Sequence, residues 1–573
     1  MAATVLAVFY PTVSGELNSI DDMDMVTGLL NLEQWRLKDV FIPRAGEGLY
    51  YRPLLSLSFL LDKELWFMEG SFMHLENILL HLCSSILVYF LTLKLLPDTE
   101  QDTSYLPLVA ALCFGLHPLS AEPVSWVSGR SDVMAGTFVL LSAIALVKFK
   151  LEQDKKFLFF SVLALLLGLL TKEVAMAFLP GAFFILMARS PQENPGDAAD
   201  EDRHRDKVKK LLLCGAIVAG SALFFFLLRS HAFTSNSPRI GMTLKFIFND
   251  PNQAIFVFFK TFGFYMKKLY WPFPLNFAIV EVDPLYELLA LPIIVLCVYI
   301  ALRRTVISAI FLAGVFMVTP ALPIAFNQVA WTPFAERYIY IASAFVTIAT
   351  VLFFGRQLKN CRVSIPVRVA VPCLVVVIGA ATLQRNMVWK TNLSLFGDTV
   401  RKSPDFTKTW NALGVAYYLK KDLPNAEICF AKASSLYQIL GYDEKSDLNL
   451  AAVLSEEGKI KETEQVYARI LKNSRCKSEK VLEHYVQYLG ERAAVEKDPV
   501  ARAKLKREEL SYNGKLYDLT GKPLVLFRMG ELSEALGDKR SAQVHYRKAY
   551  DKFPPEDKYK KIVLRRLALS TKE

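Results

Sequence analysis

The sequence lacks the cysteine patterns that organise small secreted domains and metal-binding domains. Its 573 residues contain eight cysteines with no CxxC spacing, and most of them stand singly inside apolar runs. A zinc site or a disulfide framework needs clustered or regularly spaced cysteines. The pattern therefore predicts neither, because single buried cysteines behave as small hydrophobic residues.

Charged residues are also scarce, at 21% of the chain against 53% hydrophobic residues. The short segments of alternating polarity that mark a membrane β-barrel are missing too. Instead, the first two-thirds contain long apolar runs such as "ILLHLCSSILVYFLTLKLL". A helix needs about 20 such residues to cross about 30 Å of hydrocarbon. The sequence therefore predicts an all-α protein with a polytopic helical membrane bundle over residues 1–383.

The apolar runs predict about eleven membrane spans. The first run, "MAATVLAVFY", covers about half a span and lacks the basic residues that open a signal peptide. We therefore expect a truncated first helix. The run 254–271 carries three lysines and is expected to lie at the interface or to re-enter the membrane. The other candidate spans are 73–96, 105–118, 132–149, 157–171, 174–188, 211–229, 285–302, 305–324, 338–355 and 366–383.

The net charge of +11 lies largely in short loops beside these spans. This is the positive-inside pattern, so the basic residues indicate topology, and we expect no nucleic-acid partner. Placing the basic loops in the cytoplasm puts the amphipathic loop 14–72 and everything after residue 383 on the outer side. Both outer regions are then available to a lipid-borne ligand or a protein partner.

The last third, 384–573, becomes charged and repetitive. Its segment "WNALGVAYYLKKDLPNAEICFAKA" places Gly414 where two helices would cross and Phe430 between them, which is the spacing of a tetratricopeptide repeat. We expect an α-solenoid with repeats at about 407–440, 444–477 and 523–556. Such arrays present a concave surface to peptides, and a cap on the membrane bundle is the alternative role. The residues selected here for partner binding are Trp410, Asn411 and Tyr417.

Two acidic residues open the outer loop, in "SIDDMDM". Asp21 or Asp22 could take a proton from an acceptor hydroxyl or hold a metal ion; a solvated turn that caps the next helix is the alternative. Further along, Arg52 lies among tyrosines and a proline in "GLYYRPLLSLSF". Its guanidinium can bind phosphate oxygens bidentately, or it can reach the lipid headgroups.

Ionisable residues recur where apolar runs end. The stretch "HPLSAEPVSWVSGRSD" carries His117, Glu122, Arg130 and Asp132. Such groups beside hydrocarbon usually pair, face a wet cavity or have a function. In the predicted topology they share the outer face with Asp21, Arg52 and the pair in "LLTKEVAMAF", Lys172 and Glu173. This convergence predicts a site for an anionic, lipid-borne ligand.

Three polar residues in "HLENILLH" share one helical face: His74, Asn77 and His81. We expect them to make hydrogen bonds between helices. A metal pair is the alternative, but no clustered carboxylates or cysteines accompany these histidines in the sequence.

Taken in order, the quoted segments resemble a known family. The series "DD … YYRPLLSLSF … FMHLENILLH … ALCFGLHPLSAEPVSWVSGRSDVMAG … LLTKE … ERYIYIAS … RNMVWKTNLSLF" followed by repeats looks like the transmembrane and tetratricopeptide-repeat-containing O-mannosyltransferases. That family is similar in plan to GT-C glycosyltransferases, which use polyprenyl-phosphate sugars. The resemblance implies an enzyme that transfers a sugar, mannose in the family, to a Ser or Thr hydroxyl of a protein bound through the repeats.

The resemblance also implies roles for the selected residues. Asp21, or its neighbour Asp22, would be the base, and Arg52 would contact the lipid phosphate. A divalent cation is a candidate cofactor. The protein would lie in a bacterial inner membrane with periplasmic repeats, or in the endoplasmic reticulum membrane with luminal repeats. The residues expected to line or support the donor cavity are His117, Glu122, Arg130, Asp132, Lys172 and Glu173.

Two other classes of function compete with an enzyme. A membrane-anchored repeat scaffold would recruit partners without chemistry, but it has no reason to gather charges at one edge of the bundle. A transporter would favour an internally repeated half and charges near the middle of the membrane. The sequence shows no repeated half, and its charges lie at span ends, so we rank the enzyme first and the scaffold second.

Overall fold

The computed structural model describes residues 1–42, 51–96, 104–189, 245–327, 332–360, 365–436 and 444–570, with isolated positions between 215 and 229. Throughout these ranges every regular element is a helix, and the only strand-like feature is one bridge between Ile279 and Phe334. The all-α prediction is confirmed. The chain divides into two compact units, Met1–Pro404 and Asp405–Glu573, so the second begins later than the change of composition at residue 384.

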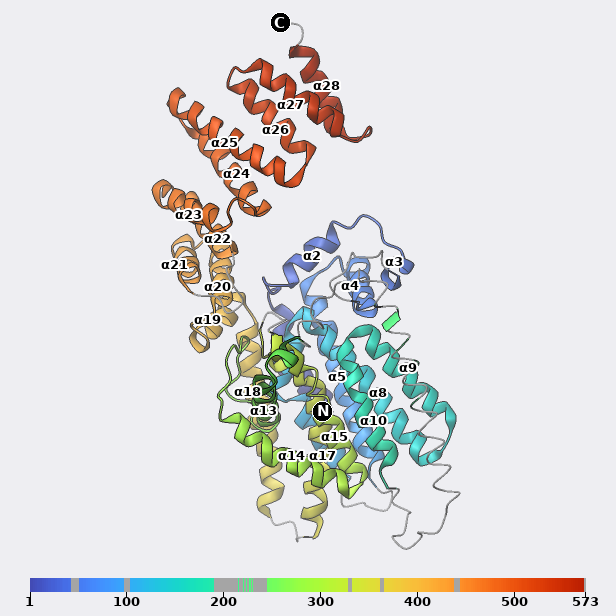
Figure 1. The fold of residues 1–573 in the computed structure, drawn as a ribbon. Coiled ribbons are helices and arrows are strands. Elements are labelled where there is room, and N and C mark those ends of the chain that lie inside the picture. Colours follow the sequence, from blue (N-terminus) through green and yellow to red (C-terminus); the bar gives the residue numbers. More distant parts are fainter. Residues whose placement is uncertain are drawn as a thin grey trace. The chain divides into compact units, whose positions relative to one another are not determined.

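The first unit is a helical bundle (Figure 1). Short 3₁₀ turns interrupt its longer helices at η1 Tyr10–Ser14, η3 Pro118–Ser120, η4 Val127–Gly129, η5 Glu173–Ala177 and η6 Glu336–Ile339. Its α-helices are α1 Ala2–Phe9, α2 Asp22–Leu30, α3 Leu37–Phe41, α4 Pro53–Trp66, α5 Gly70–Lys94, α6 Leu106–Gly115, α7 Ala121–Ser125, α8 Arg130–Glu152, α9 Lys155–Thr171, α10 Phe178–Met187, α13 Pro251–Tyr270, α14 Tyr286–Arg303, α15 Val306–Phe316, α16 Ala321–Asn327, α17 Tyr340–Asn360, α18 Ile365–Trp389 and α19 Asn392–Lys402.

Six helical segments in the described ranges are long and apolar enough to cross a membrane. A seventh span results if α6 is counted with the segment Pro118–Ser125, which meets it at an angle of 46°. The membrane bundle predicted from the apolar runs is therefore supported by the model. The six segments are Gly70–Lys94, Val127–Glu152, Tyr286–Arg303, Val306–Phe326, Glu336–Gln357 and Val369–Trp389.

The remaining expected spans are shorter or lie outside the described residues. Ala2–Ser14 and Glu173–Met187 are shorter apolar helices, and α9 has 17 residues. The expected span 211–229 falls almost wholly outside the described residues. A total of eleven spans therefore stays a prediction, as does the interfacial position of the run 254–271, which forms α13.

The outer loop 14–72 is largely helical where it is described. Its helices α2, α3 and α4 lie across one end of the bundle (Figure 1). Pro53 is well suited to the first turn of α4, where a missing N–H costs little. The segment before α2 is fastened to α19, because the amide of Ser19 donates to Asn392 at 3.0 Å and Glu16 accepts from the amide of Asn392 at 2.9 Å.

Asn77 and His81 on the polar face of α5 make the interhelical hydrogen bonds expected from the sequence, whereas the buried His74 has no hydrogen-bond partner for its ring nitrogens among the described residues. The His81 ring lies 2.8 Å from the Tyr340 hydroxyl through Nδ1 and 3.0 Å from the Gly115 carbonyl through Nε2. The Asn77 amide donates to the Trp126 carbonyl at 2.9 Å. These contacts join α5 to α6, to α17 and to the chain between α7 and α8. They favour a structural role for this face over the metal pair.

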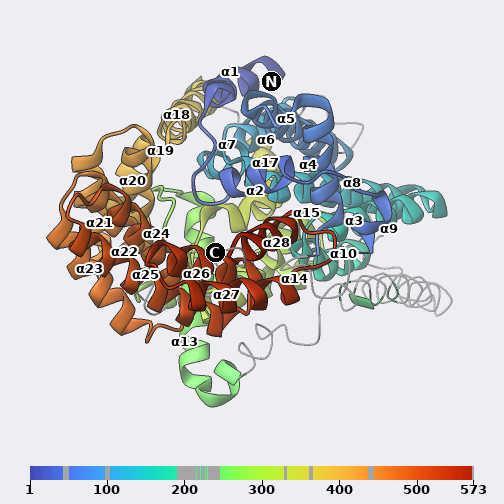
Figure 2. The ribbon, with the colours of Figure 1, turned by 90° about the horizontal axis from the view of Figure 1, so that it is seen from above.

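The second unit consists of helices that follow one another in a curved row (Figure 2). Aspartate side chains cap several of them by accepting backbone N–H groups at the first turn, as Asp498 does for α25. The helices are α20 Thr407–Leu419, α21 Leu423–Ser435, α22 Glu444–Glu456, α23 Ile460–Asn473, α24 Glu479–Val495, α25 Pro499–Thr520, α26 Pro523–Ala535, α27 Lys539–Lys552 and α28 Lys558–Ser570.

Small and large residues pair between neighbouring helices of this unit. A Cβ atom added to Gly414 would lie 2.6 Å from the Phe430 ring, and one added to Gly530 would lie 2.4 Å from the Tyr546 ring. This is the kind of close approach that the repeat spacing implies. It supports the expected helical hairpins at 407–440 and 523–556, while the tetratricopeptide assignment itself stays a prediction.

We expect Gly530→Ala to loosen the α26–α27 hairpin. The new methyl group would overlap the Tyr546 ring, and overpacking of this kind costs about 1–3 kcal/mol. Hydrogen-exchange mass spectrometry of the full chain should show faster exchange in peptides from α26 and α27, by about 30-fold for a cost of about 2 kcal/mol, in the middle of that range.

Gly514→Ala in α25 is the matched control. The nearest side-chain atom to its added Cβ is the Met529 methyl at 3.9 Å, so alanine should fit and should slow exchange through its better helix propensity. Equal protection in the two variants would contradict the packing described for Gly530.

Candidate active site

Arg130 connects the helices α4, α5 and α8 at the end of the first unit where the loop 14–72 lies. Its side chain is 1% exposed, and its guanidinium donates to Asp62 at 2.7 Å and to Asn77 at 3.0 Å. Glu76 lies 3.0 Å away, and the Met73 carbonyl accepts at 3.2 Å. Through these contacts Arg130 joins α4, α5 and α8, while its place in the donor cavity stays a prediction.

Two ion pairs bring the remaining predicted charges together. Lys172 donates to Asp132 at 2.6 Å, and both residues are buried. Arg52 forms a bidentate pair with Glu173, with distances of 2.9 and 3.1 Å. An attractive electrostatic interaction between Lys172 and Glu173 links the two pairs. The structure therefore gathers these four residues from the loop, α8 and the end of α9, as predicted, and gives each cation a carboxylate partner.

The two neighbouring aspartates have different surroundings. Asp22 is fully buried and accepts hydrogen bonds from the Ser128 amide at 2.9 Å and the Asn18 amide at 3.0 Å, as well as from the Ser128 hydroxyl. Burial raises the pKa of Asp22 to about 6, against the effect of these hydrogen bonds. Asp21, at the start of α2, is exposed. Asp22 therefore anchors the loop to η4, while Asp21 faces outward beside it.

Glu122 joins α7 to η6, the 3₁₀ turn at the start of the candidate span Glu336–Gln357. Its carboxylate accepts the backbone amides of Glu336 at 3.1 Å and Arg337 at 3.2 Å, and it forms an ion pair with the Arg337 guanidinium. That guanidinium also lies over the Trp126 ring, 4.8 Å from its centre. His117 is half-buried and accepts from the amide two residues further on. Glu122 thus supports the site from within the bundle.

Three basic residues of the network were not selected from the sequence. Besides Arg337, they are Lys268, which pairs with Glu336 at 2.9 Å, and Arg385, which pairs with Asp398 at 2.8 Å. Arg337 and Arg385 lie in "ERYIYIAS" and "RNMVWKTNLSLF". A charged residue at the end of an apolar run indicates a functional or paired group. This criterion fits Arg337 and Arg385, so it would have identified both arginines from the sequence.

The network is continuous across the end of the bundle. Attractive electrostatic interactions link Asp132 to Arg337, and Glu122 to both Arg337 and Arg385. In the described ranges, no three side chains of His, Cys, Asp and Glu come together as a metal site. The candidate divalent cation therefore has no set of ligands among those residues.

The residues selected for partner binding lie on α20. Trp410 and Tyr417 are half-buried, and Asn411 accepts a hydrogen bond from Asn449 at 2.9 Å. These contacts neither require nor exclude a bound peptide, so the role of the three residues stays a prediction.

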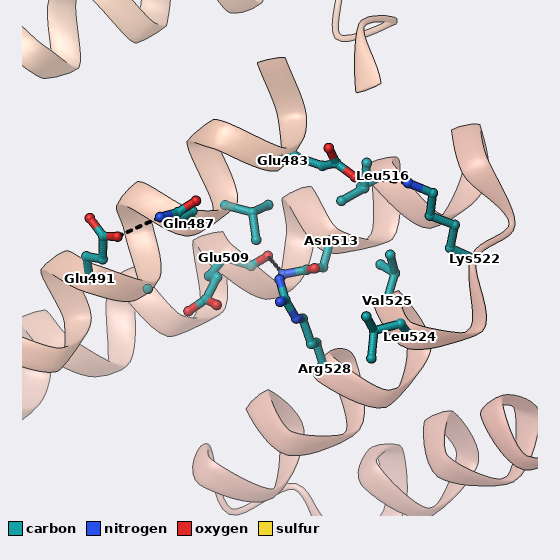
Figure 3. Close-up of a pocket in the computed structure, with 12 residues that line it drawn as sticks. Glu483, Gln487, Glu491, Glu509, Asn513, Leu516, Lys522, Leu524, Val525 and Arg528 are labelled. Atoms are coloured by element: carbon teal, nitrogen blue, oxygen red, sulfur yellow. Dashed lines mark hydrogen bonds and ion pairs between the residues drawn. The ribbon is translucent and has the colours of Figure 1, made fainter. Parts of the chain in front are cut away.

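A groove of about 440 Å³ lies elsewhere in the second unit, between α24, α25 and α26. Figure 3 shows Glu509, Asn513 and Arg528 around it. Asn513 is buried, and its amide donates to the Glu509 carbonyl at 2.9 Å, while its Oδ1 has no hydrogen-bond partner among the described residues. The groove combines polar and apolar walls, which suits an extended peptide better than a wholly apolar ligand.

Part of the first unit matches the model of a known protein family. A model described as a predicted membrane protein family, DUF2142, matches residues 79–343. This range contains most of the candidate spans listed above.

Curated proteins with sequence similarity are named as O-mannosyl-transferases. Protein O-mannosyl-transferase TMTC2 of Mus musculus is 35% identical over 107 residues, 19% of this chain and 12% of the relative. Protein O-mannosyl-transferase TMTC4 of Homo sapiens is 31% identical over 138 residues, 22% of this chain and 18% of the relative. Protein O-mannosyl-transferase F38B6.6 of Caenorhabditis elegans is 24% identical over 384 residues, 64% of this chain and 50% of the relative. The alignments thus cover half or less of each relative's length.

We expect Arg130→Met to destabilise the protein strongly. The substitution leaves Asp62 buried without its cation, and breaking a buried pair in this way costs about 3–5 kcal/mol. Thermal unfolding of the full chain in detergent should show a large fall in midpoint. Arg36→Met, which breaks the exposed Arg36–Asp39 pair, should cost at most about 1 kcal/mol. Similar shifts in both variants would refute the cross-linking role of Arg130.

We also expect Asp22 to make stability depend on pH. Its pKa in the folded protein, about 6, lies above its ordinary value of 3.8, so the folded state binds the proton more tightly. The stabilisation is complete below about pH 3.8 and is lost as the pH rises through about 6. The unfolding midpoint of the wild type should therefore fall relative to that of Asp22→Asn between pH 4 and 7. A constant difference would show that Asp22 is ionised throughout.

Proposed function

We propose that this protein is an integral membrane glycosyltransferase. It moves a sugar, mannose by analogy with the named relatives, from a polyprenyl-phosphate donor to a hydroxyl group of a Ser or Thr residue in a protein. The proposal combines the similarity to proteins named O-mannosyl-transferases with one structural observation. That observation is the continuous network of charged side chains at one end of the first unit.

The network suits a donor that is part lipid and part phosphate. Its members lie at the ends of apolar helices, so a polyprenyl chain can lie against the bundle while its head group meets polar side chains. The buried pair Lys172–Asp132 and the half-exposed pair Arg52–Glu173 hold charges in fixed positions. Fixed charges stabilise a transition state without the cost of reorganising solvent.

Asp21 is the proposed base. It lies at the exposed start of α2, next to Asp22, whose two hydrogen bonds with Ser128 hold that helix against η4. Asp21 would remove the proton from the acceptor hydroxyl, whose oxygen then attacks the anomeric carbon. The bond from that carbon to the phosphate oxygen breaks with inversion, and polyprenyl phosphate leaves. The carboxylate of Asp22 already accepts three hydrogen bonds, so Asp22 is better suited to position Asp21 than to act as the base.

A membrane-anchored scaffold is the second candidate function. The groove between α24, α25 and α26 favours it, because a peptide site does not require chemistry in the first unit. The same groove also serves the enzyme as an acceptor site. Partner binding that persists in an Asp21→Asn and Arg52→Gln double variant, together with no sugar transfer by the wild type, would favour the scaffold.

We expect Asp21→Asn to abolish sugar transfer without loss of folded protein. The assay uses purified full-length protein in detergent, radiolabelled polyprenyl-phosphate mannose and total periplasmic protein as acceptor. Loss of a general base lowers the rate by about 100-fold or more. The control is Asp24→Asn, because Asp24 is an exposed acid in the same first turn. Full activity in Asp21→Asn would remove this residue from the mechanism.

A further inference from the structure

Two of the three guanidinium nitrogens of Arg385 are buried without a hydrogen-bond partner in the described part of the chain. The residue lies near the end of α18 and is 4% exposed. Its Nη1 donates to Asp398 at 2.8 Å, whereas Nε and Nη2 have no hydrogen-bond partner in the described part of the chain. Nε–H and Nη2–H point in the same direction, and together they form the fork that binds two oxygens of a carboxylate or a phosphate.

Two indole groups in this region also have unpartnered N–H donors. Trp389 follows one helical turn later on α18, and Trp126 packs against it with ring centres 6.3 Å apart. Both are at least nine-tenths buried, and neither Nε1 has a partner within the described ranges. Ser125 and Asn386 hold the two chain segments together by a hydrogen bond of 3.2 Å.

The charge around Arg385 is unbalanced. Its carboxylate partner, Asp398, also accepts from Lys402 at 2.6 Å and lies 3.8 Å from Arg401, so one negative charge serves three cations. The nearby Glu122 is already paired with Arg337 and with two backbone amides. A buried cation without its own counter-ion is costly, which favours an anionic ligand at this place.

The unpartnered atoms of Arg385, Trp126 and Trp389 are all donors, so the missing partner is an acceptor. By contrast, Arg52 and Lys172 already have carboxylate partners. We infer that the phosphate group of the lipid-linked donor binds to the Nε–Nη2 edge of Arg385 and to the indole N–H groups of Trp126 and Trp389. This inference rests on the proposed function, and it assigns the phosphate contact to Arg385 rather than to Arg52.

The position on the helix also suits a lipid phosphate. Arg385 and Trp389 lie in the last two turns of the candidate span Val369–Trp389, where the hydrocarbon gives way to water. Arginine and tryptophan are both suited to this boundary, because each has an apolar body and a polar tip. A polyprenyl phosphate places its own charge at the same depth.

Binding of tritiated farnesyl phosphate to the full-length protein in detergent tests the inference. Arg385→Lys keeps a cation for Asp398 but loses the fork, so affinity should fall by about 100-fold, with about 10-fold for each lost hydrogen bond to a charged group. Trp389→Phe keeps a ring but loses its N–H, and affinity should fall by about 10-fold. Thermal unfolding of each variant checks that it is folded.

Arg401→Gln is the matched control. Arg401 lies 3.8 Å from the same carboxylate, but its side chain is 78% exposed, so binding should not change. Wild-type affinity in Arg385→Lys and Trp389→Phe would overturn the inference, and so would a wild-type protein that fails to bind farnesyl phosphate.

Competition distinguishes the sources of phosphate. Unlabelled farnesyl phosphate should displace the probe better than inorganic phosphate, phosphatidylglycerol or farnesol. Stronger displacement by phosphatidylglycerol or by inorganic phosphate would assign the site to a headgroup or to free phosphate and would overturn the donor assignment. The experiment also distinguishes failure of the inference from failure of the proposed function. Probe binding that depends on Arg385, in a protein that transfers no sugar, would support the site and refute the transferase.

Discussion

An ionised side chain removed from water beside a hydrocarbon layer is unstable unless a partner of opposite charge and further hydrogen bonds replace its hydration. This requirement organises the polar end of the first unit. Arg130 lies against Asp62 and Glu76, Lys172 against Asp132, and the other buried cations also meet carboxylates. The pairs join helices that are distant in the sequence, so the same contacts that neutralise charge also fix the positions of the helices. Arg385 departs from the rule, because its counter-ion is shared.

Much of the fold follows from the sequence alone, because apolar length is a local property. Long apolar runs predicted helices that the structure contains, and the spacing of Asn77 and His81 predicted a polar face that packs against neighbouring helices. The number of spans was harder to predict, since short helices such as α10 and η5 combine with bends and 3₁₀ turns. Apolarity alone does not show whether a short helix crosses the membrane or ends within the bundle.

The pairing of charges could not be predicted from single positions. The sequence singled out Arg130 at the end of an apolar run, but nothing in "SGRSD" shows that Asp62, far away on α4, binds its guanidinium. In the same way, the sequence drew attention to two adjacent aspartates without separating the buried Asp22 from the exposed Asp21. That separation depends on Ser128, a residue of the opposite segment. Roles within the site are therefore set by tertiary contacts, whereas its location is set by local sequence.

The long sequence separation of the pair between Glu122 and Arg337 has a consequence for biosynthesis. The two residues are 215 positions apart, and a ribosome adding about 5–20 residues per second needs roughly 10–40 seconds to make the intervening chain. During that interval the segment carrying Glu122 has left the ribosome while its counter-ion does not yet exist. The nascent bundle must therefore keep this carboxyl group hydrated or protonated until the later span arrives. Assembly of the polar end is consequently a late event, completed only when the C-terminal spans of the first unit dock.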